Sequence, residues 1–175
     1  MRTRPHIRIA TQTDLNQLCE IGKQTFIETY AYQNTPENLM KYLEKKFNKS
    51  QILDEIQTPQ TIFLLVELES KVIGYSKMRI NLVENTDENA LEIERIYICK
   101  VYHGQKYGAD LMQKCVAVAV ENSYTSLWLG VWEHNPKAIE FYRKWGFEVF
   151  GTHIFHLGDD AQTDFLMKKT LTQLF

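Results

Sequence analysis

One stretch of the sequence limits the fold more than any other: a strand pattern leads through a glycine-bearing loop directly into a long helix pattern. Residues 91–98 alternate polar and apolar side chains, which is typical of a half-buried β-strand. From about residue 108 to residue 121, apolar side chains recur at helical spacing. Together the two patterns predict a chain that packs helices against a sheet.

The N-terminal third of the chain has mainly helical signals. A short strand at residues 7–9 precedes a first helix that Thr13 or Asp14 would cap with a side-chain oxygen. Thr35 caps a second helix, with Pro36 at its first position, and a shorter helix follows near residues 52–56.

The remaining segments complete a predicted sheet. Strands are expected at 61–68, 72–78 and 91–98, then at 126–132, and finally as a hairpin of 147–157 with 162–168. The long helix and a helix from Pro136 to about Trp145 lie between them. This order predicts one α/β (α+β) domain over residues 1–175, in which a mixed, largely antiparallel sheet of about seven strands has helices on both faces.

Composition narrows the class of protein. A chain of 175 residues with 44% hydrophobic side chains can bury a core without disulfides or metals. Its net charge of −2 gives no bulk attraction to nucleic acid. Its three cysteines are far apart and form no paired motif, which favours reduced thiols over a disulfide framework or a metal site. With no leader-like or membrane-spanning apolar run, we expect a cytoplasmic protein that binds no membrane.

The glycine-bearing loop after residue 98 suggests a binding site. Several backbone N–H groups converge at the start of a helix, where the helix dipole favours a phosphate or pyrophosphate. The alternative is a tight turn that needs Gly104 and Gly108 only for backbone freedom. The loop alone does not decide between the two.

A second stretch decides between them. Gly130 lies within the strand L-W-L-G-V-W, and N-P-K-A-I-E-F-Y-R-K-W-G-F follows a few residues later. Together with the glycine-bearing loop, this stretch resembles the GNAT superfamily of N-acetyltransferases, and the resemblance extends over nearly the whole chain. Asn135, Ala138, Phe141 and Tyr142 match the pattern of the family's helix after this strand.

The match to the family's phosphate-binding motif is partial. That motif reads Arg/Gln-x-x-Gly-x-Gly/Ala, and Gly108 matches its final glycine. His103 stands where the family usually has Arg or Gln, and Lys106 stands at the first glycine. A lysine there can reach a phosphate but gives up the conformational freedom of glycine.

The resemblance implies the GNAT acyltransferase fold and acetyl-coenzyme A as the acetyl donor. It also implies that backbone groups of Ile96 and Ile98 run along the pantetheine arm. The cofactor contacts that it implies are Ile96, Tyr97, Ile98, His103, Gly104, Gln105, Lys106, Tyr107, Gly108, Ala109, Asn135, Ala138 and Phe141.

The resemblance also assigns catalytic roles. It makes Tyr142 the general acid toward the coenzyme A sulfur, although an aromatic side chain on an amphipathic helix can serve packing alone. Glu92 and Glu94 lie two apart on one strand and so face the same side. Relatives place a catalytic glutamate near either position, acting directly or through a water, and Glu94 ranks slightly above Glu92. The alternative for the pair is an exposed strand face.

For the acceptor, the segments L-W-L-G-V-W-E-x-N, F-Y-x-K-W-G-F and H-x-F-x-L-G-D-D-x-Q-T-D resemble the bacterial PaiA-type branch. That branch acetylates spermidine and spermine, which implies direct attack by a small polyamine in a ternary complex. One alternative is a protein N-terminal or amino-acid N-acetyltransferase, for which residues 29–35 would have to leave an open peptide groove. Another is a coenzyme-A-binding regulatory module without turnover. A homodimer is also expected, since dimers are common among relatives.

Several other residues are weaker candidates for a catalytic or metal-binding role. His153 and His156 are predicted to face opposite sides of a strand, so we expect no metal pair. Cys115 is predicted to be a core residue, and Cys99 lacks the partners of a nucleophile. Several acids are predicted to lie in loops, where they are solvated or, if they rim a cleft, attract a polycation. They are Glu84, Asp87, Glu88, Asp159, Asp160 and Asp164.

Overall fold

The computed structural model describes residues 2–172, which form a seven-stranded sheet in the order β1-β2-β3-β4-β5-β7-β6. Neighbouring strands are antiparallel except for β4 and β5, which are parallel. The strands are β1 (His6–Ile9), β2 (Ile62–Leu68), β3 (Lys71–Arg79), β4 (Ala90–Ile98), β5 (Ser126–Trp132), β6 (Glu148–Leu157) and β7 (Asp160–Thr170). The predicted fold class is confirmed, down to the mixed sheet.

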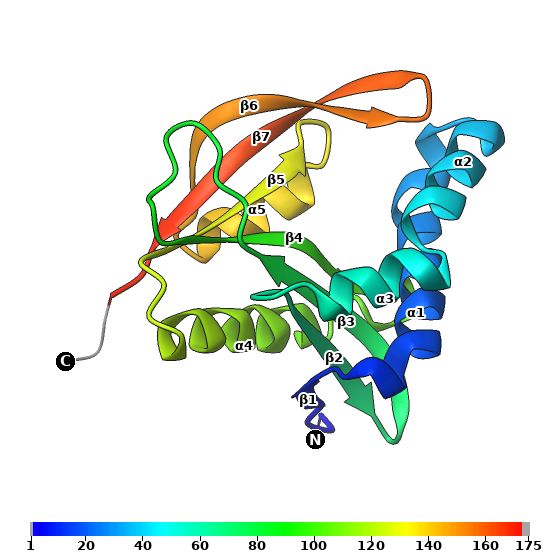
Figure 1. Ribbon diagram of the computed structural model, residues 1–175, viewed down its shortest axis with the longest axis horizontal. Helices are drawn as coiled ribbons and strands as arrows, with labels where there is room; N and C mark the ends of the chain where they lie inside the picture. The colour runs from blue at the N-terminus through cyan, green and yellow to red at the C-terminus, as the bar shows by residue number, and fades with distance from the viewer. Residues whose placement is uncertain (1, 173–175) are drawn as a thin grey trace.

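Helices cover both faces of this sheet (Figure 1). One face carries α4 and α5, and the other carries α1, α2 and α3. Their bounds are α1 (Leu15–Tyr30), α2 (Pro36–Lys46), α3 (Lys49–Gln57), α4 (Tyr107–Glu121) and α5 (Pro136–Lys144). Three short 3-10 turns are η1 (Gln12–Asp14), η2 (Ala31–Gln33) and η3 (Lys100–Tyr102).

The two faces of β2 show how alternation builds two cores. Leu64 and Val66 pack with the α4 side, whereas Phe63 and Leu65 pack with the side of α1 and α3. All four are almost fully buried. A strand buried on both faces is expected at the centre of a layered fold, where each face needs its own apolar row.

One of the helix caps predicted in the N-terminal third of the chain is confirmed and the other is wrong. Thr35 accepts a hydrogen bond from the Asn38 N–H at 3.2 Å and caps α2, as predicted. The cap predicted for the first helix was wrong. Asp14 occupies the capping position of α1, but its carboxylate accepts from the Thr11 N–H and from Arg8 instead. The arginine on β1 competes for the carboxylate, and a charge-assisted pair is stronger than a neutral cap.

The sheet opens between its two parallel strands. Only residues 90–92 of β4 pair with residues 126–128 of β5. Beyond them β4 continues to Ile98 with only β3 as its partner, and β5 continues to Trp132 with only β7. Two strand ends therefore diverge in the middle of the sheet, and the loop to α4 begins where one of them ends.

A β-bulge lies just beyond the last β4–β5 pair. Ile93 faces Met78 across the β3–β4 ladder and Arg95 faces Lys77, so Glu94 is an extra residue with no partner in that ladder. A bulge bends a strand and sharpens its twist. Here it lies where β4 leaves β5.

The hairpin of β6 and β7 reaches across to the helices on the α1–α3 side, as Figure 1 shows at the upper right. The Asp159 N–H at its tip donates to the Asn38 side chain at 3.2 Å, and Gln162 donates to the Asn34 side chain at 3.0 Å. These bonds tie the hairpin to α2 and to the connection that precedes it. The segment 29–35, expected as a loop, is largely helical, since it comprises the end of α1 and η2.

Candidate active site

The loop between β4 and α4 presents unused backbone donors at a helix start. Among the described residues, the N–H groups of Gln105, Lys106, Tyr107 and Gly108 donate no hydrogen bond. Lys106 is in the left-handed region with φ of 66°, and Gly104 has φ of 76°. A Cβ on Gly108 would have only Ile98 Cγ1 near it, at 4.0 Å. Free N–H groups, an open surface and the positive end of a helix dipole fit a phosphate group.

Neighbouring segments hold this loop in place. The Lys100 N–H donates to Glu28 on α1 at 2.8 Å, and a ring nitrogen of His103 donates to the Ile98 carbonyl at 2.7 Å. Arg2 donates to the Gln105 carbonyl at 2.7 Å and pairs with Asp110 at 2.8 Å. The His103 side chain therefore points back to the end of β4. Arg2 and this loop are about a hundred residues apart, so no local pattern could predict their contact.

Helix α5 follows β5, on the other side of the opening between β4 and β5. Asn135 accepts from the Ala138 N–H at 3.2 Å and caps this helix, as predicted. Tyr142 is half-buried and packs edge-on against Phe141 and Phe147. Burial raises the pKa of the Tyr142 hydroxyl, and Tyr30 and Cys115 nearby raise it further. A phenol with a raised pKa keeps its proton at neutral pH and can donate it.

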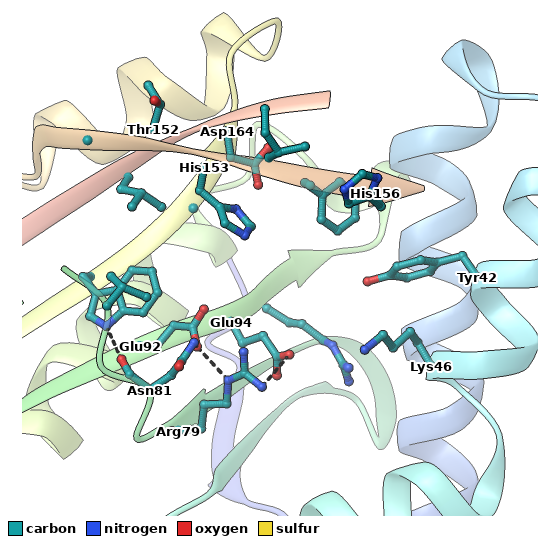
Figure 2. Close-up of a pocket in the computed structure, with 18 of the residues that line it drawn as sticks. Tyr42, Lys46, Arg79, Asn81, Glu92, Glu94, Thr152, His153, His156 and Asp164 are labelled. Carbon is teal, nitrogen blue, oxygen red and sulfur yellow. Dashed lines mark hydrogen bonds and ion pairs between the residues drawn. The ribbon is translucent and has the colours of Figure 1, made fainter. Parts of the chain in front are cut away.

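A cavity of about 650 Å³ lies on the opposite face of the sheet, beside the bulge in β4 (Figure 2). Its walls come from α1, α2, β3, β4, β5 and the β6–β7 hairpin. Glu92 and Glu94 both line it, so their predicted common face is found in the structure although Glu94 is the bulged residue.

The floor of this cavity is a network of buried charges. Arg95 donates two hydrogen bonds to Glu55 of α3, at 3.0 and 3.1 Å. Lys77 contacts both Glu55 and Glu94. Arg79 contacts Glu92 at 2.7 Å and Glu94 at 3.2 Å, as the dashed lines in Figure 2 show. Three acids and three cations thus balance one another, which is the condition under which charges can be buried. We call Glu55, Lys77, Arg79, Glu92, Glu94 and Arg95 the charge network.

The network sets the ionisation of its members. Burial raises the pKa of Glu94, but Arg95, Lys77 and Arg79 outweigh burial, and the net pKa lies below the usual value. Burial lowers the pKa of Lys77, with Glu94 and Glu55 acting in the other direction. Glu94 is therefore an ionised carboxylate at neutral pH whose oxygens already contact cations.

The wall opposite the charge network comes from the hairpin. Figure 2 shows Asp164 and His153 there, across the cavity from Glu92 and Glu94. The sequence reading placed Asp164 and Asp160 in loops. This was wrong, because both belong to β7, and only Asp164 lines the cavity. The predicted placement of His153 and His156 on opposite sides of the strand stays a prediction. Every residue of β6 from 150 to 156 lines the cavity, so lining it does not distinguish the two sides of the strand.

The helix side of the cavity is aromatic. Phe26 stacks on Tyr42 with ring centroids 4.3 Å apart, and Tyr42 meets Phe155 of the hairpin edge-on. The Tyr30 and Tyr97 hydroxyls are 3.4 Å apart. Aromatic rings therefore line one end of the cavity, and such rings favour contact with an alkyl chain or a cation.

The predicted site residues thus fall into two groups. The loop residues 103–109 and the α5 residues lie near the opening between β4 and β5, whereas Glu92, Glu94 and the Tyr97 side chain line the cavity.

Cys115 is fully buried and is a core residue, as predicted. No helix in the described part of the chain is long and apolar enough to cross a membrane. Residues 2–172 contain no cluster of three groups that could hold a metal ion.

Comparison with known proteins adds a family and several relatives. The model of the acetyltransferase (GNAT) family matches residues 18–147. The chain is 40% identical over 163 residues to an uncharacterised N-acetyltransferase of Lactobacillus delbrueckii subsp. lactis, covering 92% of this chain and 94% of that protein. It is 26% identical over 167 residues to the spermidine N(1)-acetyltransferase of Thermoplasma acidophilum, covering 93% and 95%.

A solved structure agrees over almost the full length. The PaiA N-acetyltransferase of Thermoplasma acidophilum, crystallised with coenzyme A, superposes with a TM-score of 0.78 at 25% identity, covering 96% of this chain and 99% of that one. The ribosomal-protein-S18-alanine N-acetyltransferase of Escherichia coli has a TM-score of 0.74 at 15% identity, which shows a shared fold.

Proposed function

The chain belongs to the acetyltransferase (GNAT) family, and on that premise we propose that it acetylates a polyamine such as spermidine or spermine. It is an N-acetyltransferase of the GNAT type and uses acetyl-coenzyme A. The observation that carries the acceptor proposal is the cavity opposite α4. It has an aromatic end and a carboxylate, Asp164, that has no lysine or arginine partner among the described residues. The full-length similarity to a spermidine N(1)-acetyltransferase supports the same acceptor class.

In this proposal the cofactor brings an activated acetyl thioester, and the protein orients it with backbone groups. The free N–H groups of residues 105–108 receive the pyrophosphate, and Lys106 adds a positive charge. Gly104, His103 and Ala109 complete the loop, and Ile96, Tyr97 and Ile98 supply the open strand of β4. The remaining predicted contacts, Asn135, Ala138 and Phe141, shape the start and inner face of α5.

Tyr142 acts as the general acid in this proposal. Its hydroxyl retains its proton at neutral pH because burial raises its pKa, and it can protonate the departing thiolate. Glu94, with Glu92, was predicted to receive the proton of the amine. Because both carboxylates are already in ion pairs, we propose that they act through a water that they orient.

A polyamine fits the cavity because acidic residues on one side can bind its ammonium groups and aromatic rings on another side can contact its methylene chain. The charge network is internally balanced and offers little net attraction. Asp164 and Glu84 are the lining acids outside that network. Tyr42 and Phe155 offer ring faces to the chain or to a second ammonium.

A specific observation favours an amino acid as the second candidate acceptor. Lys45 and Lys46 line the cavity and form no ion pair within residues 2–172, so they could hold a carboxylate. A protein N-terminus is less well supported. The bonds from Asn34 and Asn38 to the hairpin close the side on which an extended peptide would need an open groove.

The test is a thiol-release assay with spermidine, spermine, free amino acids and short peptides at fixed acetyl-coenzyme A. The polyamine proposal expects turnover with spermidine and spermine, and a KM for spermine that rises with salt as attraction is screened. If amino acids or peptides are acetylated and neither polyamine is, the polyamine proposal is rejected. The use of acetyl-coenzyme A as the acetyl donor is unaffected by that result. The variant Lys45→Ala/Lys46→Ala should raise the KM only for a carboxylate-bearing acceptor.

The predicted cytoplasmic location is also kept as a proposal. All three cysteines are buried and free, which is consistent with a reducing compartment.

A further inference from the structure

Asp164 combines two features that no other acid in the cavity shares: it is partly buried, and its carboxylate makes no hydrogen bond or ion pair within the described residues. Glu92 and Glu94 contact cations in the charge network, and Glu84 is exposed. Asp164 is held on β7, an inner strand that pairs with both β5 and β6. An acid without a partner in a partly buried position costs stability, so its presence calls for a ligand or a proton.

The neighbouring strand makes room for this carboxylate. Gly130 on β5 lies beneath it, and a Cβ at that position would be 3.3 Å from Asp164 Oδ2. That distance is tighter than an ordinary van der Waals contact, so any side chain at Gly130 would push the carboxylate aside. The same strand precedes α5, which carries Tyr142.

The surroundings leave Asp164 easy to protonate. Burial raises the pKa of Asp164 to about 6, and His153, its cross-strand neighbour on β6, offsets only part of this. The other titratable or charged groups around the cavity are Tyr30 on α1, Tyr42, Lys45 and Lys46 on α2, Arg79 on β3, Glu92, Glu94, Arg95 and Tyr97 on β4, His156 on β6 and Glu84 in the loop before β4. Among these groups, Tyr30 is the one whose pKa the Asp164 charge raises, in addition to the larger effect of burial.

We propose that Asp164 binds the ammonium form of the acceptor and receives its proton. This inference rests on the proposed transfer of acetyl to an amine, but not on the amine being a polyamine. Three features carry it: the position of Asp164 in the cavity, its lack of a lysine or arginine partner among the described residues, and the space that Gly130 provides. Glu92 and Glu94 then act as positioning residues that orient the water through which the nitrogen loses its second proton, and Asp164 takes the first.

The protons balance as follows. The ammonium loses one proton to Asp164, and the nitrogen lone pair forms the C–N bond to the acetyl carbon. The C–S bond breaks, and the sulfur takes a proton from Tyr142. Tyr142 regains a proton from the second N–H that the nitrogen loses, through water, and Asp164 releases its own proton to solvent. The net products are the amide, the free thiol and one proton.

The variant Asp164→Asn tests this role through the pH dependence of kcat/KM with spermidine, measured from about pH 5.5 to about pH 9. The wild type should reach a plateau above about pH 7, because Asp164 accepts the proton from an ammonium. Asp164→Asn can use only the rare neutral amine, so its kcat/KM should be roughly 10²-fold lower at pH 7 and rise about tenfold per pH unit. The deficit should therefore shrink as the pH rises.

The matched control is Asp160→Asn, which removes the same charge from the start of β7 outside the cavity. It should keep the wild-type plateau. Identical pH profiles for Asp164→Asn and wild type would overturn the proposal. If the wild type does not acetylate spermidine but does acetylate an amino acid or a peptide, the polyamine proposal fails. The same comparison of variants is then made with that acceptor.

A measurement on the unaltered protein needs neither turnover nor a variant. In the wild type, the carboxyl carbon of Asp164 can be followed by NMR while spermidine is added in the absence of cofactor. Its signal should shift on addition of spermidine, and its apparent pKa should fall as the ammonium binds. A carboxyl signal that does not respond to saturating spermidine would reject contact between Asp164 and the amine.

Discussion

The two halves of the proposed active site are built from different parts of the chain. The loop between β4 and α4 offers backbone N–H groups from four consecutive residues, 105–108. The cavity on the opposite face is built from residues of seven helices and strands spread between Phe26 and Leu166. One half depends on local conformation, and the other depends on how distant elements pack.

This difference has consequences for mutation and for pH. Backbone donors do not titrate and survive most substitutions, so the loop should be sensitive only to added bulk or charge. The cavity depends on charges whose ionisation is set by burial and by their neighbours, so it should respond to pH and to the loss of single carboxylates.

The variant Gly108→Asp should have the largest effect, and on the backbone half alone. The open space around Gly108 lets the variant fold, but its carboxylate lies where a phosphate is expected. Two like charges about 4 Å apart near a protein surface repel by about 4 kcal/mol, so coenzyme A should bind about 10³-fold more weakly in calorimetry. Gly108→Ala should bind within a few-fold of wild type. Equal affinities for all three proteins would place the phosphate site elsewhere.

The charge network should give the next largest effect, now on the side-chain half. Glu55→Gln leaves Arg95 and Lys77 buried without their shared acid. Removing one partner from a buried ion pair costs about 3 kcal/mol or more in the free energy of unfolding, measurable by urea denaturation. Glu44→Gln, an exposed change on α2, is the control and should cost under about 0.5 kcal/mol. A similar small loss for Glu55→Gln would mean that water already compensates the network.

Tyr142→Phe should separate chemistry from packing. The ring contacts with Phe141 and Phe147 remain, and the hydroxyl makes no hydrogen bond within residues 2–172. Stability and coenzyme A affinity should stay at wild-type values while kcat falls by about 10²-fold, the scale of one general acid. An unchanged kcat at saturating substrates would leave Tyr142 with packing alone.

Asp164→Asn should lower the activity but raise the free energy of unfolding at high pH. The folded-state pKa of about 6 lies above the ordinary aspartate value of 3.8, so the folded state holds its proton more tightly. Asp164 therefore stabilises the fold below about pH 4, and that contribution is lost as the pH rises through about 6. At pH 8 the asparagine variant should be more stable than wild type by up to about 2 kcal/mol, since part of the carboxylate still contacts water. At pH 4 the difference should vanish. A variant less stable than wild type at pH 8 would mean that Asp164 has a structural partner.

Arg2→Ala should give the smallest effect, on the backbone half. Arg2 holds the Gln105 carbonyl, pairs with Asp110 and lies over the Tyr107 ring at 5.0 Å. Its loss frees a negative charge beside the phosphate loop, and a partly exposed pair is worth about 1 kcal/mol at most. Coenzyme A affinity should fall by about three- to fivefold, with Arg2→Lys between the two. A change in the KM for the amine without a change in cofactor affinity would show that the two halves are not independent.

The same division explains what the sequence could predict. Periodicity and turn residues predicted the strands, because β2, β3 and the hairpin turn at Glu69 and Ser70 are specified by adjacent residues. The loop at residues 105–108, where we propose that the pyrophosphate binds, and the cap at Asn135 are also specified by adjacent residues. The bulge at Glu94 could not be predicted, because it depends on which residues of β3 and α3 supply partners for Glu94 and Arg95.

The cavity was largely hidden from the sequence for the same reason. Glu92 and Glu94 were selected correctly as neighbours on one face, but their ion pairs with Lys77 and Arg79 arise only when β3 and β4 align. Asp164 resembled other acids of the last hairpin, and only tertiary packing gives it a buried position over Gly130. An aspartate in the middle of an otherwise strand-forming run was the one signal that could have singled it out.

The opening between β4 and β5 has a consequence for the behaviour of the protein at high concentration. Each diverging strand presents unpaired backbone groups along one side, and such edges can recruit strands from other molecules into aggregates. The bulge at Glu94 lies on this stretch of β4, where it bends and twists the strand and places a charge beside the open edge. A flat template for intermolecular pairing is therefore absent from this stretch. Glu94 is thus the residue that makes this edge irregular, as well as a member of the charge network.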